Sequence, residues 1–66
     1  METDFYRAWA HVYLARIARQ RGEMANARRV AQAGLAFKTP ALETPVLWPG
    51  EARDRSAAEE LRRLAQ

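Results

Sequence analysis

All three prolines of this chain lie in one short stretch, at positions 40, 45 and 49. Proline lacks a backbone amide hydrogen and has a fixed φ, so it disfavours both a regular helix and a central strand. We therefore predict an extended, polyproline-like connector over residues 39–50. Because solvated linkers avoid large hydrophobic side chains, we expect this apolar connector to lie across the rest of the fold. Its large apolar residues are Leu42, Val46, Leu47 and Trp48.

The stretch before residue 22 contains neither proline nor glycine and is rich in alanine and arginine, which predicts a helix over residues 4–21. At 100° per residue, its apolar side chains spread over about 200° of the helix surface, more than one neighbouring helix covers. Such a face either packs against two elements of the same chain or leaves apolar surface for a partner or a second copy. In order around the helix, it consists of Phe5, Trp9, Val12, Tyr13, Tyr6, Ile17, Ala10 and Leu14.

Gly22 interrupts this pattern and lowers the cost of a turn. A second helix is predicted over residues 23–37, before Pro40 ends the segment. Small residues lie along the middle of its apolar side and permit close contact with the first helix. These residues are Ala27, Ala31 and Gly34. The two helices are predicted to form an antiparallel hairpin.

The segment Ser56-Ala57-Ala58-Glu59 has the spacing of a capping box, in which the serine hydroxyl accepts from the third amide. It predicts a short C-terminal helix over residues 57–65. Its apolar side would consist of Ala57, Leu61, Leu64 and Ala65, while Glu59, Arg62 and Arg63 face water. The adjacent Glu59 and Glu60 are interpreted as part of a solvated helix face. The fold class is therefore all-α, with a helical hairpin, an apolar connector and a short third helix.

Residues 1–66 are enough for one small domain, whose core supplies only a few kcal/mol of net stability. The chain has no cysteine, so neither a disulfide nor a thiolate metal site can add to this. No apolar run approaches the roughly 20 residues that cross a bilayer, and the first four residues are acidic rather than basic. We expect a single cytoplasmic domain without a membrane span.

The first 40 residues resemble one tetratricopeptide-type helical hairpin. The resemblance rests on small and apolar positions: Leu14, Ala15, Gly22, Ala27, Ala31 and Gly34, with Pro40 just beyond. No second copy follows, although solenoid repeats bury their faces against neighbouring repeats. The resemblance implies hairpin geometry and a protein-binding role.

The sequence offers no catalytic constellation. The only serine, Ser56, is explained as a helix cap, and the adjacent Glu59 and Glu60 would point about 100° apart on a helix. His11 is the only histidine, has no carboxylate four residues away, and is expected to face solvent. The three glycines are isolated from one another, so no phosphate-binding loop is present. We expect a protein that is not an enzyme and carries no cofactor or metal.

Aromatic residues are the first candidates for a binding surface, because tryptophan, tyrosine and arginine are enriched where partners bind most strongly. The alternative is that they form the core of the domain, since helical spacing usually means burial. For Trp48, the alternative is that it covers the hairpin. The candidate protein-binding residues are Phe5, Tyr6, Trp9, Tyr13 and Trp48.

Arginines form the second candidate surface. The formal net charge is +3, and five arginines against one glutamate give an excess of four positive charges within residues 16–29. Such a cluster can meet an acidic protein face, a phosphate backbone or anionic lipid, or it can be ordinary solvated surface. The candidate residues for a charged interface or for nucleic-acid binding are Arg16, Arg19, Arg21, Arg28 and Arg29.

These features favour a non-enzymatic protein-interaction module, such as a small regulator or inhibitor of a larger protein. The alternative is a nucleic-acid-binding regulator that uses the arginines near the hairpin turn, although no zinc finger, basic zipper or aromatic RNA-binding motif is present. A homodimer through the first helix would hide the aromatic surface. The high alanine and arginine content hints at a GC-rich bacterial or phage origin.

Overall fold

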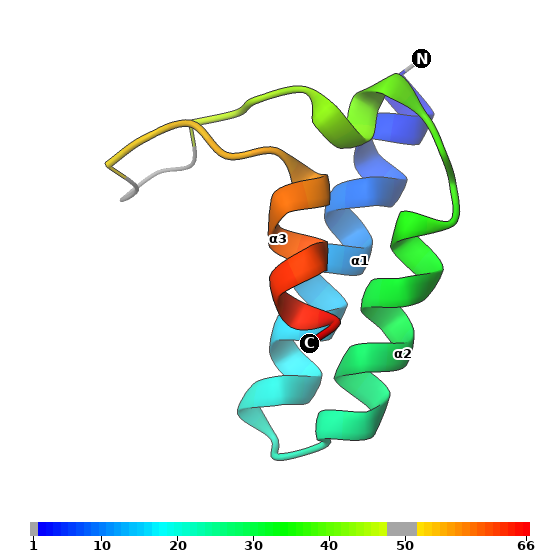
Figure 1. The fold of residues 1–66 in the computed structure, drawn as a ribbon, viewed down its shortest axis with the longest axis vertical. Helices are drawn as coiled ribbons and strands as arrows, with labels where there is room; N and C mark the ends of the chain where they lie inside the picture. The colour runs from blue at the N-terminus through cyan, green and yellow to red at the C-terminus, as the bar shows by residue number, and fades with distance from the viewer. Residues whose placement is uncertain (1, 48–51) are drawn as a thin grey trace.

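The computed structural model describes residues 2–47 and 52–66, and in these residues the chain forms three α-helices and no strand. The helices are α1 (Glu2–Gln20), α2 (Met24–Leu35) and α3 (Ala57–Leu64), and a short 3-10 helix, η1 (Pro40–Glu43), lies in the connector. Figure 1 shows α1 and α2 as an antiparallel hairpin with α3 packed beside it. The predicted all-α fold class and hairpin are therefore confirmed.

A glycine turn joins the two long helices. Gly22 has a φ of +80°, a conformation that side chains with a Cβ atom rarely adopt. The Glu23 amide donates to the Ala18 carbonyl at 2.9 Å and the Gly22 amide donates to the Arg19 carbonyl at 3.0 Å. This pair of hydrogen bonds satisfies the last carbonyls of α1 in a Schellman motif, so the chain reverses within three residues.

Small side chains line the contact between α1 and α2. The buried positions of α2 are Ala27, Ala31 and Gly34, as predicted. Alanines are also buried on α1, at Ala8, Ala15 and Ala18. Alanine and glycine allow two helix backbones to approach closely, because no long side chain separates them. The contact is close at Gly34, where an added Cβ atom would lie only 2.8 Å from the His11 Cβ atom.

Helix α3 closes the core on the remaining side. It packs against both helices of the hairpin, and Leu61, with no exposed surface, is the largest fully buried side chain of the described residues. Ser56 caps the helix as predicted, because its hydroxyl accepts from the Glu59 amide at 3.1 Å. Glu59 does not complete the capping box; its carboxylate instead accepts from the Arg53 guanidinium. With only eight residues, α3 stops before the hairpin turn (Figure 1).

The connector is not extended throughout, which corrects the prediction for residues 39–50. Pro40 stands at the start of η1, where its missing amide hydrogen costs nothing. Thr39 caps this turn, its hydroxyl accepting from the Ala41 amide at 3.4 Å. Leu42 is buried and η1 packs on α1 and α3, so this part of the connector does lie across the helices. Residues 48–50, including Trp48, lie outside the described residues.

Beyond η1, an antiparallel bridge joins the connector to the segment before α3. Val46 and Arg55 exchange two backbone hydrogen bonds, each 2.9 Å long. The bridge positions Arg55 at the start of α3. None of the helices in the described residues is long and apolar enough to cross a membrane.

Candidate protein-binding surface

The broad apolar face of α1 divides into a buried half and an exposed half. Trp9 and Val12 are 7% and 2% exposed and belong to the core, and Phe5 is half-buried against it. Tyr6 and Tyr13, in contrast, are 67% and 68% exposed. The structure thus separates the predicted aromatic residues: Phe5 and Trp9 stabilise the fold, whereas the two tyrosines face solvent. Trp48, the fifth candidate aromatic residue, lies outside the described residues.

The exposed half forms one stripe along the side of α1 that faces away from the core, here called the outer face. Leu14 is 53% exposed, Ala10 is exposed and Ile17 is half-buried. A spacing of four, three and four residues along a helix keeps side chains on one side, as in the seam of a coiled coil. The outer face consists of Tyr6, Ala10, Tyr13, Leu14 and Ile17.

A shallow apolar groove runs along the edge of the outer face. It has a volume of about 210 Å³ and is lined by Trp9, Val12, Tyr13 and Arg16. We call it the apolar groove. Trp9 and Val12 form its floor because both are buried in the core, while Tyr13 and Arg16 are exposed. An apolar side chain of a partner could contact all four residues.

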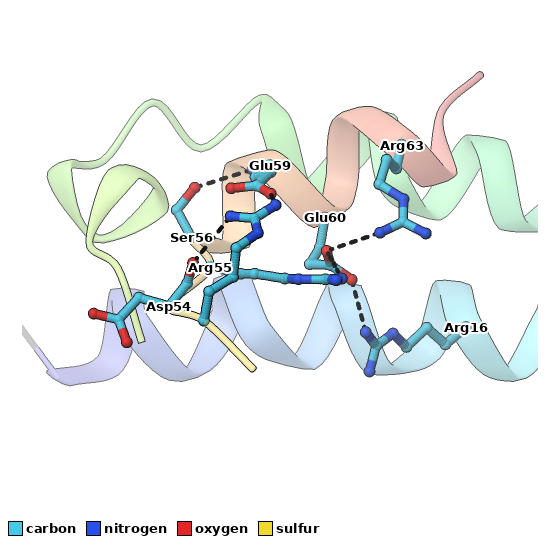
Figure 2. A network of polar contacts seen from close by, with 8 residues as sticks. Arg16, Asp54, Arg55, Ser56, Glu59, Glu60 and Arg63 are labelled. Atoms are coloured by element: carbon cyan, nitrogen blue, oxygen red, sulfur yellow. Dashed lines mark hydrogen bonds and ion pairs between the residues drawn. The ribbon is translucent and has the colours of Figure 1, made fainter. Parts of the chain in front are cut away.

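Glu60 is the polar residue that the sequence analysis placed wrongly. It was expected on a solvated helix face, but it is only 4% exposed. Its Oε1 atom accepts from Arg16 at 2.7 Å and its Oε2 atom accepts from Arg55 at 3.0 Å. Arg63 lies 3.6 Å from Oε2. Figure 2 shows these three arginines converging on the Glu60 carboxylate from α1, from the segment before α3 and from α3 itself.

The spacing of the core-facing residues in α3 indicates that Glu60 is buried. Positions 57, 60, 61 and 64 follow the i, i+3, i+4, i+7 pattern of a helix side that packs on a core, and the other three positions are Ala57, Leu61 and Leu64. Burial by itself raises the pKa of Glu60, but hydrogen bonds and positive charge from Arg16 and Arg55 outweigh this effect and lower it. Glu60 is therefore an ionised carboxylate that links three segments of the fold.

A second groove lies between α1 and α3, below the end of α3. It has a volume of about 380 Å³ and is lined by Arg16, Arg19, Gln20, Glu60, Arg63 and Leu64. We call it the arginine groove. It exists because α3 is shorter than α1, so the last turn of α1 projects beyond it. Two of the predicted arginines, Arg16 and Arg19, are brought together here, and Arg63 joins them from a region that the sequence analysis left out of the cluster.

The remaining predicted arginines do not join this groove. Arg21 lies at the hairpin turn beside a third groove of about 200 Å³, which Leu14 and Ile17 of the outer face also line. Arg28 and Arg29 are exposed on α2. The five arginines of residues 16–29 therefore do not act as one cluster.

His11 does not face solvent as expected. It is half-buried between the hairpin helices, and its ring lies edge-on to Phe37 with 5.1 Å between ring centroids. Its Nδ1 atom donates to the Arg7 carbonyl at 2.7 Å. Its Cβ atom fills the space that the missing side chain of Gly34 leaves. Within residues 2–47 and 52–66, no three side chains of the types that bind metals come together.

The comparisons with known proteins add no relative. No family model, no curated protein and no solved structure matches the chain. The resemblance of the first 40 residues to a tetratricopeptide-type hairpin therefore stays a prediction.

Proposed function

We propose that this protein is a non-enzymatic interaction module that binds a larger protein through the outer face of α1. The observation that carries the proposal is the exposure of Tyr6 and Tyr13, at 67% and 68%, beside a half-exposed Leu14. Isolated exposed apolar residues are ordinary, but five along one helix face form a contiguous patch of the kind that partners cover.

The core gives no reason for these side chains to be apolar. It is built from the opposite side of α1, from α2, from α3 and from Leu42 of η1. The tyrosines therefore contribute little to folding, yet tyrosine is a favoured anchor in protein interfaces because it buries a large area with few rotatable bonds. A domain that binds through one face acts by occupying a surface of its partner, so we propose a cytoplasmic regulator or inhibitor.

The test is a capture experiment with matched variants. The tagged full chain is incubated with lysate of the encoding organism, and a bound protein is identified, purified and titrated against the chain. Tyr13→Ala and Leu14→Ala should weaken this complex by about tenfold or more each. Leu47→Ala is the control, because Leu47 is 59% exposed but lies on the connector, and it should leave the affinity unchanged.

Circular dichroism separates loss of binding from loss of fold. Because Tyr13 and Leu14 are exposed, their replacement should change the free energy of unfolding by no more than about 0.5 kcal/mol. Full affinity in both folded α1 variants would show that the outer face is not the binding surface.

Nucleic-acid binding is the second candidate, and the exposure of Arg21, Arg28 and Arg29 near the hairpin turn supports it. It is the weaker candidate because the predicted arginines are dispersed: Arg16 and Arg19 line the arginine groove, whereas Arg21, Arg28 and Arg29 do not. The same capture experiment distinguishes the two. Nucleic acid that is removed by nuclease, released by salt and lost in an Arg28→Gln/Arg29→Gln variant would favour this function over protein binding.

A further inference from the structure

The apolar groove and the arginine groove share Arg16 as a common wall. They therefore form one continuous surface, which begins at Trp9 and Tyr13 and ends at Arg19 and Arg63. Along α1, the step from Val12 or Tyr13 to Arg16 or Arg19 spans about 5 to 10 Å. A single short segment of a partner can contact both halves at once.

The exposed charge of the arginine groove is positive. The groove is lined by the guanidinium groups of Arg16, Arg19 and Arg63 and by one carboxylate, that of Glu60. The carboxylate is buried: the Glu60 side chain is 5% exposed, whereas those of Arg16 and Arg63 are 45% and 61% exposed. A ligand approaching from solvent therefore meets the arginines and not the acid. Because charges in a concave site act through less water than charges on a flat surface, the groove favours anions.

Glu60 also restricts the motion of the arginines around it. It accepts from Arg16 at 2.7 Å and lies 3.6 Å from Arg63. A flexible arginine side chain loses conformational entropy when it binds a ligand. Where the fold already restricts the side chain, part of this entropy has been lost before the ligand binds. A guanidinium group oriented in this way suits a carboxylate, which it can bind through two parallel N–H groups. Arg16, which lines both grooves, is thus oriented before any ligand arrives.

We propose that this continuous surface binds an acidic segment of the partner protein, with a large apolar side chain in the apolar groove and a nearby carboxylate in the arginine groove. This inference rests on the proposed protein-binding function and specifies the chemistry of the partner. The distance between the grooves corresponds to about one to two turns of a partner helix or about two to three residues of an extended chain. The apolar half favours a peptide over a phosphate backbone, because its floor consists of the buried side chains of Trp9 and Val12, which suit an apolar side chain better than a sugar or a phosphate.

The experiment selects ligands from a display library of random short peptides on the immobilised full chain. We expect the enriched peptides to carry a leucine, phenylalanine or tryptophan followed or preceded by aspartate or glutamate at the spacing given above. One enriched peptide is then synthesised, labelled and titrated against the variants by fluorescence anisotropy.

Two double variants, which each remove two positive charges from a different part of the surface, decide the test. Arg19→Gln/Arg63→Gln removes two charges from the arginine groove and should weaken the peptide about tenfold or more. Arg28→Gln/Arg29→Gln removes two charges from α2, outside both grooves, and should change the affinity by less than about twofold. Tyr13→Ala should weaken the same peptide, and circular dichroism confirms that all variants remain folded.

Four results would overturn the proposal. Enriched peptides without acidic residues that still depend on Tyr13 would preserve the protein-binding function but reject the acidic partner. Equal loss of affinity in the two arginine variants would show a general effect of net charge and no site. A labelled single-stranded oligonucleotide that displaces the peptide and depends on Arg19 and Arg63 but not on Tyr13 would assign the groove to nucleic acid. Absence of any enriched peptide would count against both proposals.

Discussion

At Gly34, side chains of α1 and α3 lie close to the backbone of α2. A Cβ atom added there would lie 2.8 Å from the His11 Cβ atom and 2.9 Å from the Leu61 Cδ1 atom. The Gly34→Ala variant gains about 1 kcal/mol of helix propensity, but overpacking costs about 1–3 kcal/mol and the His11 Cβ atom is fixed to the α1 backbone. We expect a net loss of stability in urea denaturation followed by circular dichroism.

The control for this prediction is Ala33→Gly, one residue away on the exposed side of α2. It should lose about 1 kcal/mol through propensity alone. If Gly34→Ala were more stable than the natural chain, the contact between the three helices would be looser than the structure shows.

Glu60 gives a prediction about pH. Because its pKa is lowered in the folded state, its contribution to stability is present above the ordinary glutamate pKa of about 4.3 and is lost as the pH falls through the folded-state pKa. Glu60→Gln should therefore reduce the free energy of unfolding by about 1–3 kcal/mol at neutral pH. The difference from the natural chain should shrink as the pH is lowered below about 4.

The neighbouring Glu59 provides a matched control. Its side chain is 36% exposed and pairs with an exposed Arg53, so Glu59→Gln should cost no more than about 0.5 kcal/mol. Chemical denaturation of both variants between pH 3 and 7 measures the effect. Equal losses in the two variants would contradict a special role for the buried carboxylate.

Among the elements, α3 depends most on its cap because it is only eight residues long. Isolated helices of this length do not form in water, yet α3 supplies Leu61, Leu64 and Glu60 to the interior. Ser56→Ala removes the acceptor of the Glu59 amide and should cost about 1 kcal/mol, while Ser56→Thr should retain most of the stability. Thermal unfolding by circular dichroism measures both. A Ser56→Thr variant as unstable as Ser56→Ala would mean that packing of the serine, and not its hydrogen bond, is important.

The sequence predicts the bounds of the three α-helices to within two residues because local signals set them. Gly22 ends the first helix in a left-handed turn and Ser56 begins the third with its hydroxyl. The packing of α1 is less predictable from the sequence. Large side chains define the apolar face by pattern, but the buried positions of α1 also include Ala8, Ala15 and Ala18, whose small size permits close approach of a neighbouring helix. Tyr6 and Tyr13 consequently lie outside the core.

The candidate site could be predicted only in part, for a similar reason. The residue types of the site are evident in the sequence, but the position of α3 decides which arginines meet. Arg63 is distant in sequence from Arg16 and Arg19, and only the packing of α3 on α1 brings it to the same groove. The η1 turn was missed because prolines were treated as extending the chain, although Pro40 at the first position of a helix is favourable.

At the scale of the whole molecule, we expect salt to act in opposite directions on two associations, the homodimer and the complex with an acidic partner. The predicted homodimer through α1 would place Arg7, Arg16 and Arg21 of each copy around one interface, between two chains that each carry a net charge of +3. Salt screens this repulsion, so sedimentation equilibrium should show a larger dimer fraction at high salt than at low salt. The complex with an acidic partner should weaken over the same range, because salt screens an attraction.

Tyr13→Glu should reduce both associations, because it places a negative charge at a residue that both would bury. Dimer formation and partner binding should therefore compete for the surface around Tyr13. A dimer that strengthens at low salt would require a different interface from the outer face of α1.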